Sequence, residues 1–199
     1  MRLSEKTLEL NFCHQFGSCI SKNLIWFGLT QRQEAKAGFD ACTRLGGKLL
    51  ILQFKATTEI RFNNSRRFHA PHDQMQALRS RCTNQRGIYY VFPLIGTTSE
   101  LINNPCILSH TWFLDVLLLP NPIPLPITWK GPVRKNKMHY IDVEPPDAFI
   151  HSETFKVTLL SSEKLLRGIR KEEIGIKPDD DLLNLPELTR KNILAVILY

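Results

Sequence analysis

Three side chains that could act together on a phosphate ester lie close to one another in the sequence: Asp40, Gln53 and Lys55. Carboxylate and amide oxygens suit Mg²⁺, a hard cation that prefers oxygen ligands. A lysine beside such a cation can orient or deprotonate a water molecule and can stabilise negative charge that builds on a phosphate. The three residue types are therefore a candidate site for metal-assisted hydrolysis, provided that the fold brings them together.

A β-hairpin is the element that would position them. Two strand-like runs, 39–45 and 48–55, are joined by Gly46-Gly47. Two-residue hairpin turns favour glycine because their central residues adopt positive φ. Apart from the candidate residues, both runs are mostly apolar on both faces, which is typical of a central, covered strand pair.

The turn also predicts the register of the hairpin. If Leu45 lies opposite Lys48, paired residue numbers add up to 93, and Asp40 lies directly opposite Gln53. Side chains two residues apart on a strand share a face, and opposite residues are about 5 Å apart. We therefore expect Gln53 and Lys55 to project from the same face as Asp40.

The elements around the hairpin indicate an α/β fold. A helix is expected over 30–37, a third strand over 57–62 and a loop over 63–67. Residues 71–82 begin with proline and have an acid two positions later, a pattern that predicts a second helix. The apolar run 88–95 is typical of a buried strand reached by a right-handed crossover. The expected order is helix, hairpin, strand, helix, strand.

Asp40, twelve intervening residues and then Gln53-Phe54-Lys55 resemble the signature of the PD-(D/E)xK, or restriction-endonuclease-like, nuclease superfamily. In that superfamily an Asp on one strand and a (D/E/Q)-x-K on the adjacent strand form the active site, often with a Glu from the preceding helix. The resemblance runs from about residue 31 to 95. It implies a restriction-endonuclease-like core with a proline-rich C-terminal extension.

The resemblance also implies a role for each residue. Asp40 and Gln53 correspond to the metal ligands, Lys55 to the catalytic lysine and Glu34 to the helix acid, with Mg²⁺ or Mn²⁺ as cofactor. The implied activity is that of a metal-dependent endonuclease that hydrolyses DNA, often in genome defence or in a mobile element. Two departures matter: no proline precedes Asp40, and Gln53 replaces the usual acid, which should weaken metal affinity. Some methylation-dependent restriction enzymes of this superfamily use Gln there.

Positive charge is concentrated beside these residues. The formal net charge of the chain is +7, and basic residues greatly outnumber acids between residues 55 and 90. Clustered positive charge suits a phosphate backbone because binding releases condensed counterions. We expect four arginines to contact the phosphate backbone of DNA: Arg61, Arg66, Arg67 and Arg79.

Length and composition set the wider frame. The 199 residues fit one domain, or one domain with a short appendage, and 43% are hydrophobic. No signal peptide or membrane segment is evident, and the five scattered cysteines are expected to be reduced, so a cytoplasmic protein that does not enter membranes is expected. We divide the chain into an N-terminal packing segment (1–30), a nuclease-like core (31–96) and a remainder of the same domain or C-terminal subdomain (97–199).

Other interpretations of the same residues stay open. Asp40 and Lys55 could form a structural ion pair at a strand end. The chain could be a catalytically inactive scaffold subunit of a larger complex that keeps the fold without the chemistry. Assembly as a homodimer or with protein partners is equally compatible with the sequence.

Three further motifs carry weaker signals. Zinc ligands are conceivable at Cys13-His14 with Cys19 or at His69 with His72, but the paired spacing of structural zinc sites is missing. Ser109-His110 with Asp115 lacks the nucleophile elbow of hydrolases. Gln76 lies on the helix where some nucleases of the superfamily place a polar residue that faces the site.

Overall fold

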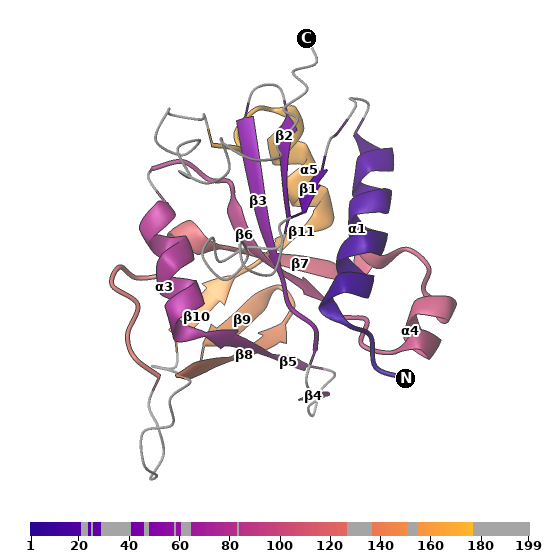
Figure 1. Ribbon diagram of the computed structural model, residues 1–199, viewed down its shortest axis with the longest axis horizontal. Coiled ribbons are helices and arrows are strands. Elements are labelled where there is room, and N and C mark those ends of the chain that lie inside the picture. Colours follow the sequence, from indigo (N-terminus) through magenta and orange to yellow (C-terminus); the bar gives the residue numbers. More distant parts are fainter. Residues whose placement is uncertain are drawn as a thin grey trace.

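The fold is mixed α/β, with two β-sheets and, in the described part of the chain, four α-helices (Figure 1). The computed structural model describes residues 1–20, 24, 26–28, 41–45, 48–57, 59–60, 65–82, 84–126, 137–150 and 155–176. The predicted α/β class is thus confirmed at this level, and a restriction-endonuclease-like core stays a prediction.

The six-stranded sheet has the order β1-β2-β3-β6-β7-β11 and the five-stranded sheet the order β10-β9-β8-β5-β4. The strands of the first are β1 (Trp26–Gly28), β2 (Ala41–Leu45), β3 (Lys48–Phe54), β6 (Ile88–Pro93), β7 (Thr111–Asp115) and β11 (Leu160–Ser161). Those of the second are β4 (Glu59–Ile60), β5 (Arg66–Pro71), β8 (Met138–Glu144), β9 (Asp147–Ile150) and β10 (Phe155–Thr158). The helices are α1 (Glu5–Cys19), α3 (His72–Arg81), α4 (Thr98–Asn103) and α5 (Ser162–Arg170), with short 3-10 helices η2 (Ile107–His110) and η3 (Val116–Leu118).

The predicted hairpin register is confirmed wherever the structure describes it. Strands β2 and β3 pair antiparallel from Leu45 opposite Lys48 to Ala41 opposite Leu52. Every described pair follows the expected sum, so the strands are in the register from which the position of Asp40 was inferred. The pairing of Asp40 with Gln53 lies just outside the described residues.

The helix and strand expected after the hairpin are also present. Helix α3 occupies nearly all of the predicted range and buries Met75 and Leu78. Strand β6 is buried along its whole length and pairs parallel with β3, so that Ile51 lies opposite Ile88. A parallel neighbour joined through a helix is the arrangement that the sequence predicted.

One expectation was wrong and one was incomplete. The N-terminal packing segment (1–30) contains a helix of fifteen residues, α1, whose buried side chains Leu8, Phe12 and Phe16 recur every four residues. Residues 63–67 were expected to be a loop, but Arg66 and Arg67 begin β5, which pairs along its length with β8. Alternation of buried and partly exposed side chains along β5 is the period of a strand with one covered face.

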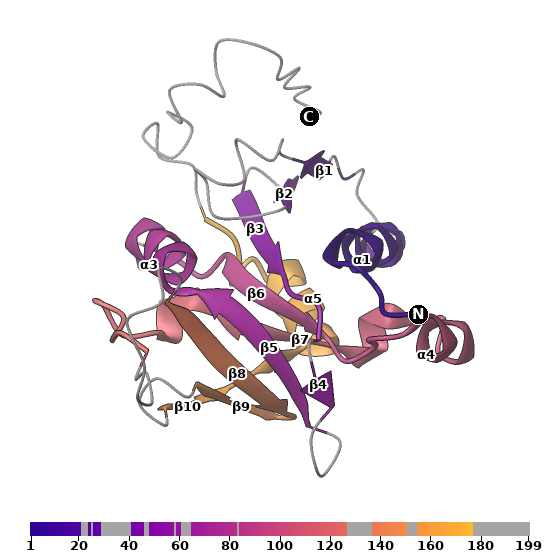
Figure 2. The same cartoon turned by 60° about the horizontal axis from the view of Figure 1, so that its bottom comes forward.

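The six-stranded sheet is the middle layer of the molecule. One of its faces packs on α1 and α5, and the other packs on α3 and the second sheet (Figures 1 and 2). Strand β3 contributes to both layers, because Leu52 and Phe54 pack on the α1 side and Ile51 on the α3 side. The ring of Phe12 lies 5.3 Å from that of Phe54, so α1 is held on the same strand that carries Gln53.

Candidate functional site

Gln53 and Lys55 lie at the carboxyl end of β3, where the strand leaves its parallel neighbour β6. The amide N–H of Lys55 donates to the carbonyl oxygen of Val91 at 3.0 Å, so the parallel ladder extends one residue past the strand. Gln53 is 1% exposed and Lys55 only 6% exposed. Carboxyl ends of parallel strands commonly carry the functional groups of α/β proteins.

The structure adds one residue to this site that the sequence interpretation missed. Glu5, the first residue of α1, places Oε1 3.8 Å from Nζ of Lys55 and accepts a hydrogen bond from the N–H of Ala56 at 3.3 Å. Its side chain is 46% exposed, whereas that of Lys55 is 8% exposed. A carboxylate at the surface therefore faces a buried ammonium group at the end of β3.

The position of Glu5 follows from the start of α1. Ser4 caps the helix, because its side chain accepts a hydrogen bond from the N–H of Thr7. Glu5 precedes Leu8 by three residues, so it lies one turn before the buried side chains, on the same face of the helix. A capping serine ahead of apolar residues at this spacing was the signal in the sequence that could have revealed both helix and acid.

Three of the predicted site residues, Glu34, Asp40 and Arg61, lie outside the described residues. Ala41, the residue after Asp40, pairs with Leu52, the residue before Gln53. This is the register in which Asp40 is predicted to lie opposite Gln53. The assignments of Glu34, Asp40 and Arg61 stay predictions.

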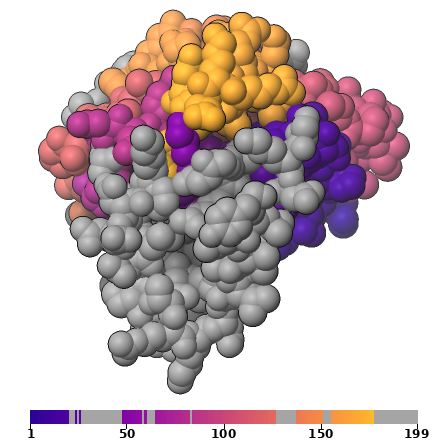
Figure 3. All heavy atoms as spheres, turned by 90° about the horizontal axis from the view of Figure 1, so that it is seen from above, coloured from indigo at the N-terminus to yellow at the C-terminus, as the bar shows by residue number. Residues whose placement is uncertain are grey.

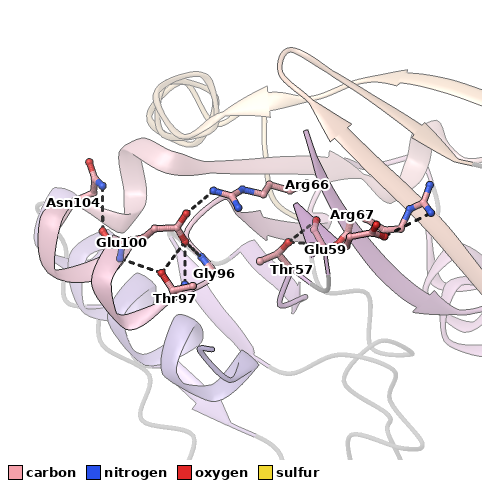
Figure 4. A network of polar contacts seen from close by, with 8 residues as sticks. All are labelled: Thr57, Glu59, Arg66, Arg67, Gly96, Thr97, Glu100 and Asn104. Atoms are coloured by element: carbon pink, nitrogen blue, oxygen red, sulfur yellow. Dashed lines mark hydrogen bonds and ion pairs between the residues drawn. The ribbon is translucent and has the colours of Figure 1, made fainter. Parts of the chain in front are cut away.

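The other predicted DNA-contacting arginines are held by groups of the protein itself. Arg66 and Arg67 are adjacent on β5, and their side chains point in opposite directions (Figure 4). Nη2 of Arg66 donates to Glu100 at 2.6 Å. Arg67 donates from Nε and Nη2 to the two carboxylate oxygens of Asp142, each at 2.6 Å, and this hydrogen bonding raises the pKa of Arg67.

Arg79 donates from Nε to the carbonyl oxygen of Leu119 at 2.7 Å and thereby ties α3 to the end of η3. Gln76 has a comparable structural contact, because its side-chain oxygen accepts the N–H of Ile123 at 2.9 Å. Both side chains therefore anchor the segment that follows β7. Arg66, Arg67 and Arg79 therefore each bind a group of the protein itself and do not form a free positive surface.

A pair of histidines forms a separate polar contact at the start of α3, whose first residue is His72. Nδ1 of His72 lies 3.0 Å from Nε2 of His139, and the rings are stacked. His139 is fully buried, and its Nδ1 has no hydrogen-bond partner among the described residues. Burial, with a smaller contribution from the nearby His72, lowers the pKa of His139 to about 4, so its imidazole is neutral at physiological pH.

The weaker motifs do not assemble into sites. Within the described ranges no group of three or more His, Cys, Asp or Glu side chains could hold a metal ion. Burial raises the pKa of Cys13 to about 12, which disfavours the thiolate that zinc requires. Ser109 donates to the carbonyl oxygen of Cys106, and Asp115 pairs with Arg86 at 2.6 Å. The conceivable hydrolase residues thus have other partners.

Comparison of the chain with protein-family models, with curated proteins and with solved structures finds no match. Among the described residues no helix is both long enough and apolar enough to cross a membrane.

Proposed function

We propose that the chain is a metal-dependent nuclease that hydrolyses phosphodiester bonds of DNA on a restriction-endonuclease-like core. The observation that carries this proposal is the nearly buried Lys55, two residues after the buried Gln53, with the carboxylate of Glu5 beside it. Lysine is almost never fully buried unless it is paired, and the partner of Lys55 is Glu5, 3.8 Å away. Because an ion pair with a buried member adds little to stability, we infer that this pair at the carboxyl end of a parallel strand serves the chemistry of the site.

Each of these residues has a chemical task in the proposed reaction. The ammonium group of Lys55 donates hydrogen bonds to a phosphate oxygen and stabilises the charge that builds up during hydrolysis. Because Lys55 is largely shielded from water, this interaction is stronger than it would be on an open surface. Glu5 balances the positive charge of Lys55 before a substrate binds and holds its side chain in one place.

The proposed ligands suit a hard cation. Gln53 offers an amide oxygen, and Asp40, predicted to lie opposite it, is the proposed carboxylate ligand. Oxygen donors suit Mg²⁺ or Mn²⁺, whereas a zinc site would need imidazole or thiolate groups. When bound, such a cation activates water and neutralises charge on the phosphate. The amide of Gln53 in place of a carboxylate should make the affinity for the cation modest.

The test is incubation with supercoiled plasmid, linear duplex and single-stranded DNA in Mg²⁺ or Mn²⁺, with EDTA as a control. Lys55→Ala and Asp40→Ala should abolish cleavage without unfolding the protein, and Gln53→Glu should retain or raise it. Lys156→Ala is the matched control, because Lys156 also forms an ion pair, with Asp147 at 2.8 Å, on the distant edge strand β10. Full activity of Asp40→Ala would refute the nuclease.

The experiment also separates the rival function. A folded protein that cuts none of these substrates and whose affinity for Mn²⁺ is unchanged by Asp40→Ala would be a scaffold subunit with a nuclease-like core. Metal-dependent cutting by the wild type, lost in both alanine variants, would exclude that interpretation.

A further inference from the structure

A short loop between β6 and α4 is fixed by one carboxylate. Oε2 of Glu100 accepts hydrogen bonds from the N–H groups of Gly96 and Thr97, at 2.8 and 3.0 Å, and Oε1 accepts from Arg66. Figure 4 shows these contacts converging on Glu100. Burial raises the pKa of Glu100, but the hydrogen bonds from Gly96 and Arg66 outweigh it and hold the pKa below its usual value.

The same loop anchors the N-terminal segment that leads into α1. The N–H of Leu3 donates to the carbonyl oxygen of Gly96, and the N–H of Thr98 donates to that of Met1, both at 2.9 Å. The atoms of α1 and of the segment that contains α4 lie next to one another on the surface (Figures 1 and 3). Because α1 begins two residues after Leu3, the loop sets where Glu5 lies.

The loop also packs directly against the chain that follows Lys55. Gly96 approaches so closely that a Cβ atom there would lie 2.3 Å from Cγ2 of Thr57. Thr57 is two residues beyond Lys55. The loop therefore contacts the two segments that carry the charged groups of the candidate site, one through backbone hydrogen bonds and the other through close packing.

We propose that Arg66 and Glu100 are a positioning pair for this site, an inference that rests on the proposed nuclease function. Arg66 holds Glu100, Glu100 holds the loop 96–98, and the loop fixes Glu5 relative to Lys55. This role differs from the expected contact between Arg66 and DNA. With Nη2 bound to Glu100 and a side chain only 13% exposed, Arg66 is better placed to brace the site than to bind a phosphate backbone.

The test compares Arg66→Met and Glu100→Gln with two matched controls, Arg167→Met and Glu163→Gln. Arg167 and Glu163 form an ion pair of the same chemistry on the exposed face of α5, with side chains 63% and 81% exposed. The variants at Arg66 and Glu100 should lower kcat roughly 10- to 100-fold, the loss expected from misplacing reacting groups, while KM stays unchanged. The control variants should keep the activity of the wild type.

Hydrogen exchange provides a measurement that does not require activity. The N–H of Ala56 binds the carboxylate of Glu5, and the N–H groups of Leu3 and Thr98 are the anchors of the N-terminal segment. In Arg66→Met and Glu100→Gln these three amides should exchange at least about tenfold faster than in the wild type. The N–H of Lys55, bound to Val91, serves as the internal reference for a folded sheet.

Three results would overturn the positioning role. One is unchanged exchange of these amides in folded variants. Another is unchanged kcat in Arg66→Met. The third is a salt dependence of DNA binding that falls by about one unit in Arg66→Met, which is the signature of a lost phosphate contact. If the wild type cuts no DNA, the nuclease proposal fails, and the exchange rates alone still decide whether Arg66 and Glu100 position Glu5.

Discussion

The buried imidazole of His139 should make the stability of this protein depend on pH. Its pKa is about 4 in the folded state, against 6.5 for an ordinary histidine. Above pH 6.5 the ring of His139 is mostly neutral in both the folded and the unfolded state, so its titration takes nothing from the free energy of unfolding there. As the pH falls below 6.5 the unfolded chain binds a proton that the folded protein does not, and the free energy of unfolding decreases until about pH 4.

The size of the effect follows from the same two values. Each pH unit between them removes up to about 1.4 kcal/mol, so the full loss is about 3 kcal/mol. The fully buried ring of His139 and its neighbour His72, 3.0 Å away, explain why the charged form is excluded. For a protein of this size, whose stability is typically about 5–15 kcal/mol, this is a substantial fraction.

Urea unfolding between pH 4 and 8 measures the effect when the wild type is compared with His139→Gln. The variant lacks the titrating ring. Between pH 6.5 and 4 its free energy of unfolding should therefore fall by about 3 kcal/mol less than that of the wild type. His14→Gln is the matched control, because His14 is exposed on α1, and its profile should run parallel to that of the wild type. Parallel profiles for wild type and His139→Gln would refute the reasoning.

Three further predictions concern the packing that supports the site. Phe12→Ala should cost about 3–5 kcal/mol in chemical unfolding, because the ring packs edge-on against Phe54; a loss below about 1 kcal/mol would contradict this. Arg67→Met should cost about 3 kcal/mol because Asp142, whose side chain is 8% exposed, loses a bidentate partner; a surface-type pair would lose under about 1 kcal/mol. Gly96→Ala should lower the melting temperature because of its clash with Thr57, and Thr57→Ser, which removes the clashing methyl group, should restore it; failure of this rescue would place the strain elsewhere.

The hairpin was predictable because its determinants are local. Gly46-Gly47 in the sequence predicts a two-residue turn, and such a turn predicts which residues lie opposite one another, in agreement with the observed pairing of β2 with β3. The strand β6 and the helix α3 have equally local signals, a continuous apolar run and a proline at the start of a helical pattern. The register, the buried strand and the helix therefore agree between sequence and structure.

The second sheet and the acid beside Lys55 depend on contacts between distant parts of the chain. Strand β5 starts with two arginines, which suggest a solvated loop until β8, some seventy residues later, supplies Asp142 to pair with Arg67. Glu5 meets Lys55 only because α1 docks on β3 through Phe12. Nothing in the local sequence around either residue identifies the other.

The order of the strands ties the two sheets together during folding. Strands β4 and β5 leave the first sheet between β3 and β6, which are themselves paired, and the second sheet is completed by β8, β9 and β10, which follow β7. Neither sheet can therefore be finished from a continuous piece of the chain. A fragment that ended after β7 would leave β5 without β8, so its exposed edge would be open to aggregation. We expect the protein to acquire its stability in one late, cooperative step governed by long-range pairing, after the whole chain is available.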